Sequence, residues 1–184
     1  MADEALIDEI VEYWFGEGAK LYWFAPTESF DRQVRDMLLD PHERAAAGRL
    51  DHWLDDVDGC LALTILLDQV PRNAFRGTPR AFATDEKARA VARHVIQNDF
   101  DLECEPEERM FLYLPFEHHE DLNSQTLSVQ LFRERVGVSE PIDFAERHRA
   151  VIERFGRFPH RNAVLGRPST ADESAFLAEH PEGF

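Results

Sequence analysis

The chain has 184 residues, 43% of them hydrophobic and 30% charged, which is typical of a single globular domain spanning residues 1–184 with a core of its own. Its formal net charge of −16 argues against nucleic acid and anionic membranes as partners, because both attract basic surfaces. No signal peptide or bilayer-spanning apolar run is visible, and Cys60 and Cys104 form no C-x-x-C motif. We therefore expect a cytoplasmic protein whose two thiols are reduced and unbridged.

Apolar residues recur at helical spacing along most of the chain, interrupted by proline and glycine. In the first half of the chain, the expected helices are residues 3–15, a stretch capped by Ser29, a short stretch from Pro41 to near Gly48, and an apolar central stretch over 58–70. In the second half they are residues 84–100, 106–115, 121–136 and 141–155. A last helix is expected to begin at the capping box of Thr170 and Glu173. No alternating run indicates a β-sheet. The sequence thus predicts an all-α fold of about eight helices.

The central stretch has little polar surface, and we expect Leu63, Leu66 and Leu67 to be nearly inaccessible to solvent. A residue that precedes proline disfavours helical backbone angles, so Val70 and Phe158 are predicted to mark helix ends. His42 is interpreted as a solvated surface residue, and so are His52, His94 and His180.

The chain repeats one loop pattern. Residues 72–79 (RNAFRGTP) align without gaps with residues 161–168 (RNAVLGRP), and Pro71 and Pro159 lie just upstream. We name these the first and second Arg-Asn segments. An apolar helix is expected before each segment and an acidic helix start after it, which indicates one helix–loop–helix arrangement used twice. We expect the two segments to meet in space.

Three stretches resemble the signature motifs of the bacterial domain-of-unknown-function 924 family: residues 66–78 (LLDQVPRNAFRGT), 113–118 (YLPFEH) and 154–162 (RFGRFPHRN). The resemblance covers nearly the whole chain, with the motifs in the same order. It implies a fold similar to the tetratricopeptide-repeat class, with helix pairs stacked into an arc, and it implies no activity. The family usually has serine where this chain has His119, so the resemblance extends to Glu117 and His118 only.

Arginines in and beside the Arg-Asn segments are candidates for an anion site, because guanidinium groups bind carboxylates and phosphates through paired hydrogen bonds. They are spaced by four residues in each case, and asparagine suits the turn that follows a helix. The candidate ligand-binding residues here are Arg72, Asn73, Arg76, Arg157, Arg161 and Asn162. The alternative is structural: each arginine pairs with a carboxylate such as Asp68, Glu117, Asp121 or Glu153, and each asparagine caps a helix end.

Glu117, His118 and His160 complete the candidate ligand-binding residues. Together with His148 and Asp121 they could assemble a general acid–base pair or a divalent metal site, but their spacing matches no recognised metal-ligand motif. No G-x-S-x-G motif and no glycine-rich phosphate-binding loop occurs, and Cys60 lies in an apolar stretch typical of an inert thiol. The sequence therefore predicts neither a metal nor a cofactor.

Three hypotheses follow. The first is a binding module whose Arg/Asn/His/Glu pocket takes a small anionic ligand or a carboxylate-bearing segment of a partner protein. The second is a hydrolase that uses His118 or His160 with Glu117 as acid and base, with or without a metal ion. The third is that the motifs only stabilise the fold. Recognition groups outnumber nucleophiles, which favours binding over catalysis, and nothing in the sequence indicates an oligomeric state.

Overall fold

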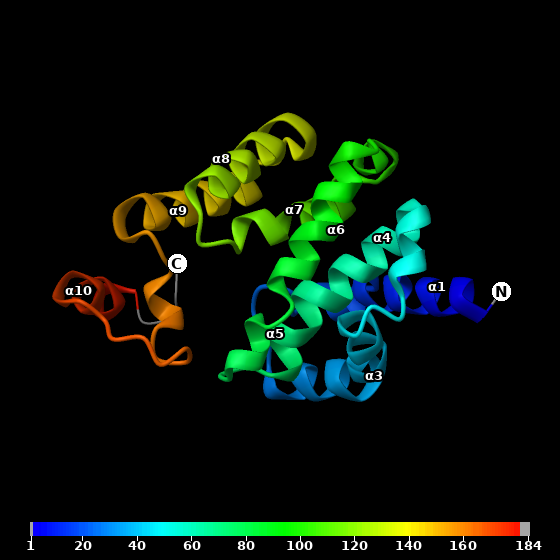
Figure 1. Cartoon of the computed structure of the whole chain (residues 1–184), viewed down its shortest axis with the longest axis horizontal. Coiled ribbons are helices and arrows are strands. Elements are labelled where there is room, and N and C mark those ends of the chain that lie inside the picture. Colours follow the sequence, from blue (N-terminus) through cyan, green and yellow to red (C-terminus); the bar gives the residue numbers. More distant parts are fainter. Residues whose placement is uncertain (1, 181–184) are drawn as a thin grey trace.

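The computed structural model describes residues 2–180, and it contains no β-strand among them, which confirms the predicted all-α fold (Figure 1). The α-helices are α1 (Ala2–Phe15), α2 (Glu17–Lys20), α3 (Glu28–Ala46), α4 (Val57–Thr64), α5 (Val70–Ala74), α6 (Asp85–Gln97), α7 (Pro106–Glu117), α8 (Leu122–Leu131), α9 (Ser139–Phe155) and α10 (Ala171–Glu179). Short 3-10 turns are η1 (Asp51–Asp55), η3 (Pro79–Phe82), η4 (Phe100–Glu103) and η6 (Pro159–Arg161), and π-helical turns are η2 (Ile65–Gln69) and η5 (Phe132–Val136). The stacked helix pairs implied by the resemblance are compatible with this arrangement.

The core surrounds the segment made of α4 and η2, which contacts α1, α3, α6 and α7. Leu63, Leu66 and Leu67 are at most 3% exposed, which confirms that the central segment is deeply buried. Side chains of this kind contribute several kcal/mol each when fully buried, roughly 2–5 by the cost of truncation to alanine. This core holds η2 rigidly, and the polar residues that end η2 are therefore fixed in position.

The predicted helix end at Val70 is wrong, because the helix continues through Pro71 to Ala74. In η2 the Val70 N–H donates to Ile65 O, which leaves Leu66 O free to accept from His42 Nδ1 at 2.7 Å. Pro71 has no N–H, and the carbonyl that it would have bonded, Leu67 O, accepts from Thr84 Oγ1 at 2.6 Å. Side chains from α3 and from the start of α6 thus replace the missing helical bonds. His42 is consequently buried, and its interpretation as a surface residue was wrong.

Other boundaries shift for local reasons. α3 runs unbroken through Pro41, so the separate short helix expected there does not form, and its cap is Thr27 rather than Ser29 because Thr27 Oγ1 accepts from Phe30 N at 3.2 Å. α7 likewise continues through Pro115. α9 ends at Phe155, before the predicted end at Phe158, because Gly156 adopts a left-handed conformation with φ 69°. The predicted capping box at Thr170 and Glu173 is confirmed.

α10 lies at the end of the molecule away from the N-terminus, beside the end of α9 (Figure 1). It is held by a small apolar cluster of Val151, Ile152, Phe158 and Phe176, which is separate from the main core. No helix in the described part of the chain is long and apolar enough to cross a lipid bilayer. Cys60 and Cys104 are buried and unbridged, and burial raises the pKa of both thiols to about 12.

Candidate functional site

A cavity of about 450 Å³ is bounded by the loop between α2 and α3, by η2 and α5, by the C-terminal part of α7, by η5 and by the N-terminal part of α9. Its volume suits a small organic molecule. The lining side chains are of two kinds. The polar ones are Gln69, Arg72, Asn73, Arg76, Glu117, His118, Glu140 and His148. The apolar ones are Trp23, Phe24, Pro26, Met110, Leu114, Phe132, Pro141 and Phe144.

Asp68 and His118 form a hydrogen-bonded pair at the polar side of the cavity. Asp68 is fully buried at the end of η2, and its Oδ1 lies 2.9 Å from His118 Nδ1, while Gln69 Nε2 donates to its Oδ2 at 2.5 Å. Burial alone would raise the pKa of Asp68, but the charge of Arg72 and the contact with His118 outweigh it and lower the pKa to about 2. Burial and Arg72 lower the pKa of His118 below its ordinary value. A neutral His118 therefore donates from Nδ1 and carries its lone pair at Nε2.

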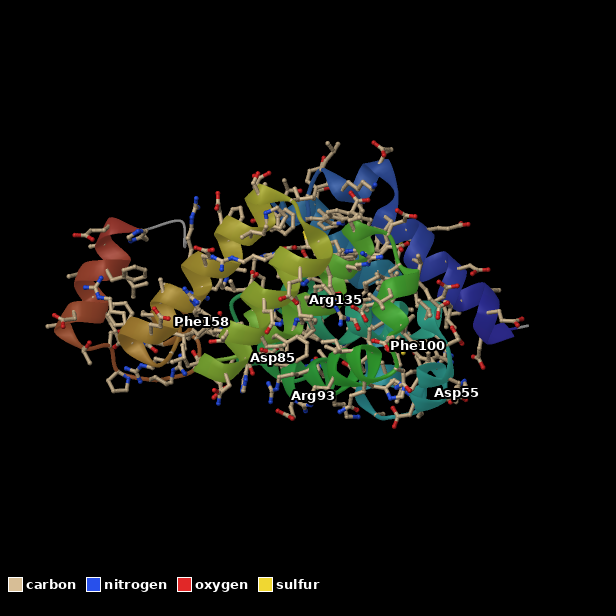
Figure 2. The ribbon with its side chains drawn as sticks, turned by 90° about the horizontal axis from the view of Figure 1, so that it is seen from above. Asp55, Asp85, Arg93, Phe100, Arg135 and Phe158 are labelled. Atoms are coloured by element: carbon tan, nitrogen blue, oxygen red, sulfur yellow. The ribbon has the colours of Figure 1, made fainter. Side chains whose placement is uncertain are left out.

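Arg72 and Arg161 meet at one carboxylate, that of Asp85 in the first turn of α6. Arg72 holds Asp85 through two hydrogen bonds of 2.9 and 3.1 Å, and Arg161 Nη1 lies 3.5 Å from Asp85 Oδ2. The Arg161 guanidinium lies over the rings of Phe82 and Phe158, and it donates to His118 O at 2.9 Å. Burial and the charge of Arg72 lower the pKa of Arg161 to about 10. Figure 2 shows Asp85 near the middle of the molecule and Phe158 on the side toward α10.

Glu117 ends α7 almost completely buried, with 4% of its surface exposed. Its Oε1 lies 3.4 Å from His148 Nδ1, while its Oε2 has no hydrogen-bond partner in the described part of the chain. Burial, with the negative charge of Asp68 as a second cause, raises the pKa of Glu117 to about 8. The pKa of His148 is lowered to about 3, chiefly by burial. At neutral pH this pair consists of a carboxylic acid and a neutral imidazole.

Asn73 lies on α5, and Arg76 lies in the turn that follows α5. Arg76 binds the Asp31 carboxylate through two bonds of 2.7 and 2.9 Å and donates to Asn73 Oδ1 at 3.1 Å. Asn73 Nδ2 in turn donates to Gln69 O at 3.1 Å. Half of the Arg76 side chain remains exposed, at 49%, so it is the most accessible guanidinium that lines the cavity.

The second Arg-Asn segment has different surroundings. Arg157 binds Glu173 of α10 through two bonds of 2.6 and 2.8 Å, and this pair lowers the pKa of Glu173 to about 2. Asn162 accepts from Arg167 Nε at 3.0 Å and donates to Ser169 Oγ at 3.1 Å. Arg167 also holds Glu120 through two hydrogen bonds. These contacts fasten α10 and the preceding loop to the end of α9.

The structure thus divides the residues singled out in the sequence into three groups. Those that line the cavity are Arg72, Asn73, Arg76, Glu117 and His118. Arg161 lies behind them and touches the site through Asp85 and the His118 carbonyl, so Arg72 of the first segment and Arg161 of the second share the Asp85 carboxylate. Arg157, His160 and Asn162 are not part of the cavity lining.

Sequence reasoning did not place Asp85, Gln69 or the aromatic side chains in the site. It treated Asp68 only as a structural partner of arginine, and the one available signal was its spacing of four residues from Arg72. Glu117 was paired with His118 or His160, whereas the structure places it beside His148. Across residues 2–180, no group of three or more His, Cys, Asp and Glu side chains is arranged to hold a metal ion.

Comparison with known proteins gives two matches. The family model described as bacterial protein of unknown function (DUF924) matches residues 10–181. Among solved structures, a protein of unknown function from Agrobacterium tumefaciens is 41% identical, with a TM-score of 0.91 over 96% of this chain and 98% of that chain. No curated protein matches the chain.

Proposed function

Because the chain belongs to a bacterial protein family of unknown function (DUF924), whose description names no activity, we propose a function from the cavity itself: it binds a small amphiphilic acid. The main observation in support of this proposal is that one cavity of about 450 Å³ combines two arginines, Arg72 and Arg76, with a set of aromatic and aliphatic side chains. Such a lining matches a ligand with a carboxylate or phosphate at one end and an apolar body.

The two arginines retain hydrogen-bonding capacity although both have carboxylate partners. A guanidinium has five N–H groups. Among the described residues, Arg72 donates to Asp68 O and twice to Asp85, and Arg76 donates twice to Asp31 and once to Asn73. Two N–H groups on each arginine are therefore left for a ligand. The purely structural alternative accounts for the ion pairs but not for an open, partly apolar cavity beside them.

The net charge of the protein indicates that these arginines act on a ligand by direct contact and not by attracting it from a distance. With a formal net charge of −16, the molecule as a whole repels anions, so affinity for an acid has to come from direct contact with the guanidiniums and from burial of the apolar body. A small molecule fits this cavity better than a segment of a partner protein, because its volume is that of a ligand pocket and not of an extended groove.

Decanoate, which has both an acid group and an apolar chain, tests the proposal. Decanol lacks the acid group and inorganic phosphate lacks the apolar chain, so these two serve as comparison probes. We expect decanoate to raise the melting temperature as its concentration passes the dissociation constant, and the other two to act more weakly. Arg76→Ala should remove the preference for decanoate over decanol. Arg80→Ala is the matched control, because Arg80 is also an exposed arginine paired with a carboxylate, Glu43, but lies outside the cavity. Equal responses to decanoate and decanol, or the same loss in both variants, would reject the proposal.

A second candidate is a hydrolase, and the Asp68–His118 pair is the observation that favours it. Asp68 fixes the tautomer that presents Nε2 of His118 as a general base. In ester hydrolysis, a water oxygen attacks the carbonyl carbon while its proton passes to Nε2, and the alcohol leaves with that proton. Hydrolysis of p-nitrophenyl butyrate that is lost in His118→Phe and retained in His119→Phe would support this candidate. A rate equal to that of buffer alone would remove it.

A further inference from the structure

Two polar atoms of the cavity lining are oriented by their neighbours but have no partner of their own in the described part of the chain. One is Nε2 of His118, on a ring that is partly exposed, and the other is Oε2 of Glu117, which is buried. Buried polar groups without partners are uncommon, because each costs free energy unless a ligand or water bonds to it. The buried Glu117 Oε2 therefore points to a ligand group that the arginines alone do not explain, and His118 Nε2 is a second atom that such a group can contact.

The direction of hydrogen bonding can be assigned at each atom. His118 Nδ1 faces the ionised carboxylate of Asp68 at 2.9 Å, so this nitrogen carries the proton and Nε2 is an acceptor. His148 Nδ1 lies 2.9 Å from Phe144 O, and a carbonyl oxygen only accepts, so His148 Nδ1 carries a proton as well.

Glu117 Oε1 lies 3.4 Å from the same nitrogen, so a proton on Oε1 would face the His148 N–H. We therefore place the proton of a protonated Glu117 on Oε2, the oxygen that has no partner among the described residues. The burial of Glu117 and the negative charge of nearby Asp68 favour this form and raise its pKa to about 8. At neutral pH the cavity thus offers one lone-pair acceptor, His118 Nε2, and one O–H donor, Glu117 Oε2.

We infer that this pair of atoms forms a hydroxyl subsite, and that the preferred ligand is an amphiphilic hydroxy acid. A hydroxyl group donates one hydrogen bond and accepts others at a single oxygen, which matches an acceptor and a donor on consecutive residues. An ammonium group lacks the lone pair that Glu117 requires, and a second carboxylate has no proton for His118. The inference rests on the proposed function, since the acid group of the same ligand binds Arg72 and Arg76.

The test compares decanoate with 2-hydroxydecanoate and 3-hydroxydecanoate by calorimetry at pH 7. One of the hydroxy acids should bind roughly three- to tenfold more tightly than decanoate, the gain expected of a net hydrogen bond. Glu117→Gln keeps an N–H donor at this position and should preserve the gain, whereas Glu117→Met should abolish it. Glu120→Gln is the control, because Glu120 is a nearby carboxylate outside the cavity lining.

The wild-type protein provides a second measurement that does not depend on a variant folding. At pH 9 Glu117 is ionised and becomes an acceptor, so the preference for the hydroxy acid should disappear, while Glu117→Gln should retain it. The other ionisable groups around Glu117 are Asp68, Arg72, His118, Glu140, His148 and Arg161. The pKa is about 2 for Asp68 and about 3 for His148, so these two do not change charge between pH 7 and 9, and Arg161, with a pKa of about 10, loses only about a tenth of its charge.

The possible outcomes distinguish failure of the amphiphile site from failure of the hydroxyl subsite alone. If no acid binds, the proposed function fails and the hydroxyl subsite fails with it. If decanoate binds and both hydroxy acids bind no better, the amphiphile site stands and the hydroxyl subsite is overturned. A gain that is unchanged in Glu117→Met also overturns it.

Discussion

The two Arg-Asn segments share a sequence pattern but differ in what surrounds them. In the first, Asn73 and Arg76 border a cavity, and half of the Arg76 side chain is exposed. In the second, Asn162 is 1% exposed and is enclosed by contacts with Arg167, Ser169 and Glu173. The pattern therefore turns the chain in both places, with Gly77 and Gly166 at positive φ, and it does not in itself make a binding site.

The neighbouring carboxyl groups show the same contrast. Glu117, beside the first segment, is buried without an arginine partner, and its pKa is raised to about 8. Glu120, beside the second, is held by Arg167 and by Phe158 N–H, and although burial opposes the effect these bonds lower its pKa. Two glutamates separated by three positions thus carry different charges at neutral pH, because only one of them has a cation in contact.

The largest expected effect is at Asp85, the point where the two segments join. Asp85→Ala should reduce the free energy of unfolding by roughly 3–5 kcal/mol, because it leaves the buried guanidiniums of Arg72 and Arg161 without their shared carboxylate. Urea denaturation measures the loss. Glu43→Ala, which breaks the exposed pair with Arg80, is the control and should change stability by about 1 kcal/mol or less. A loss below about 1 kcal/mol for Asp85→Ala would mean that the segments are not coupled through this residue.

A smaller expected effect is the pH dependence of the free energy of unfolding, to which Glu117 and Glu120 should contribute differently. Between pH 6.5 and 8 the Glu117 side chain is ionised in the unfolded chain, where its pKa is near 4.5, but mostly protonated in the folded protein, where it is about 8. At Glu117 the unfolded state then binds fewer protons, so the contribution of this residue to stability falls as pH rises. We expect Glu117 to contribute a decrease of roughly 1.5–2 kcal/mol across this window, measured by urea denaturation at several pH values as the difference between wild type and Glu117→Gln. The difference is needed because histidines whose folded-state pKa is lowered, such as His118 and His148, contribute in the opposite direction.

Glu117→Gln should remove this decrease, and Glu120→Gln should leave the pH dependence of the wild type unchanged. The folded-state pKa of Glu120 is lowered, so its contribution is present above the unfolded pKa of 4.5, is lost only as pH falls, and is constant in this window. A difference in stability between wild type and Glu117→Gln that is the same at pH 6.5 and pH 8 would show that Glu117 is ionised in the folded protein. The donor assigned to the hydroxyl subsite would then be absent.

The sequence was sufficient to predict the helices, their buried central segment and the residues of the first Arg-Asn segment, because these follow from local periodicity and turn chemistry. It was not sufficient to predict helices that continue through Pro41, Pro71 and Pro115. At Pro71 the substitutes for the lost bonds come from His42 and Thr84, which are distant in sequence. The predicted pocket included polar residues but not the aromatic part of the cavity lining, which was missed because its residues come from several separate elements. Convergence of this kind is a tertiary property that no single stretch of sequence encodes.

The smallest expected effect is at the two asparagines, Asn73 and Asn162, whose substitution should lower stability equally but change ligand binding differently. Asn73→Ala removes a donor to Gln69 O and an acceptor for Arg76, and Asn162→Ala removes the matching pair to Ser169 and Arg167, so each should cost about 1 kcal/mol in urea denaturation. Their effects on ligand should differ. Asn73→Ala releases Arg76 and should weaken decanoate binding several-fold in calorimetry, whereas Asn162→Ala should leave the dissociation constant unchanged. Because the two variants are destabilised equally, a difference in binding cannot arise from unfolding. Equal weakening by both would place the second segment in the binding site and remove the contrast between the segments.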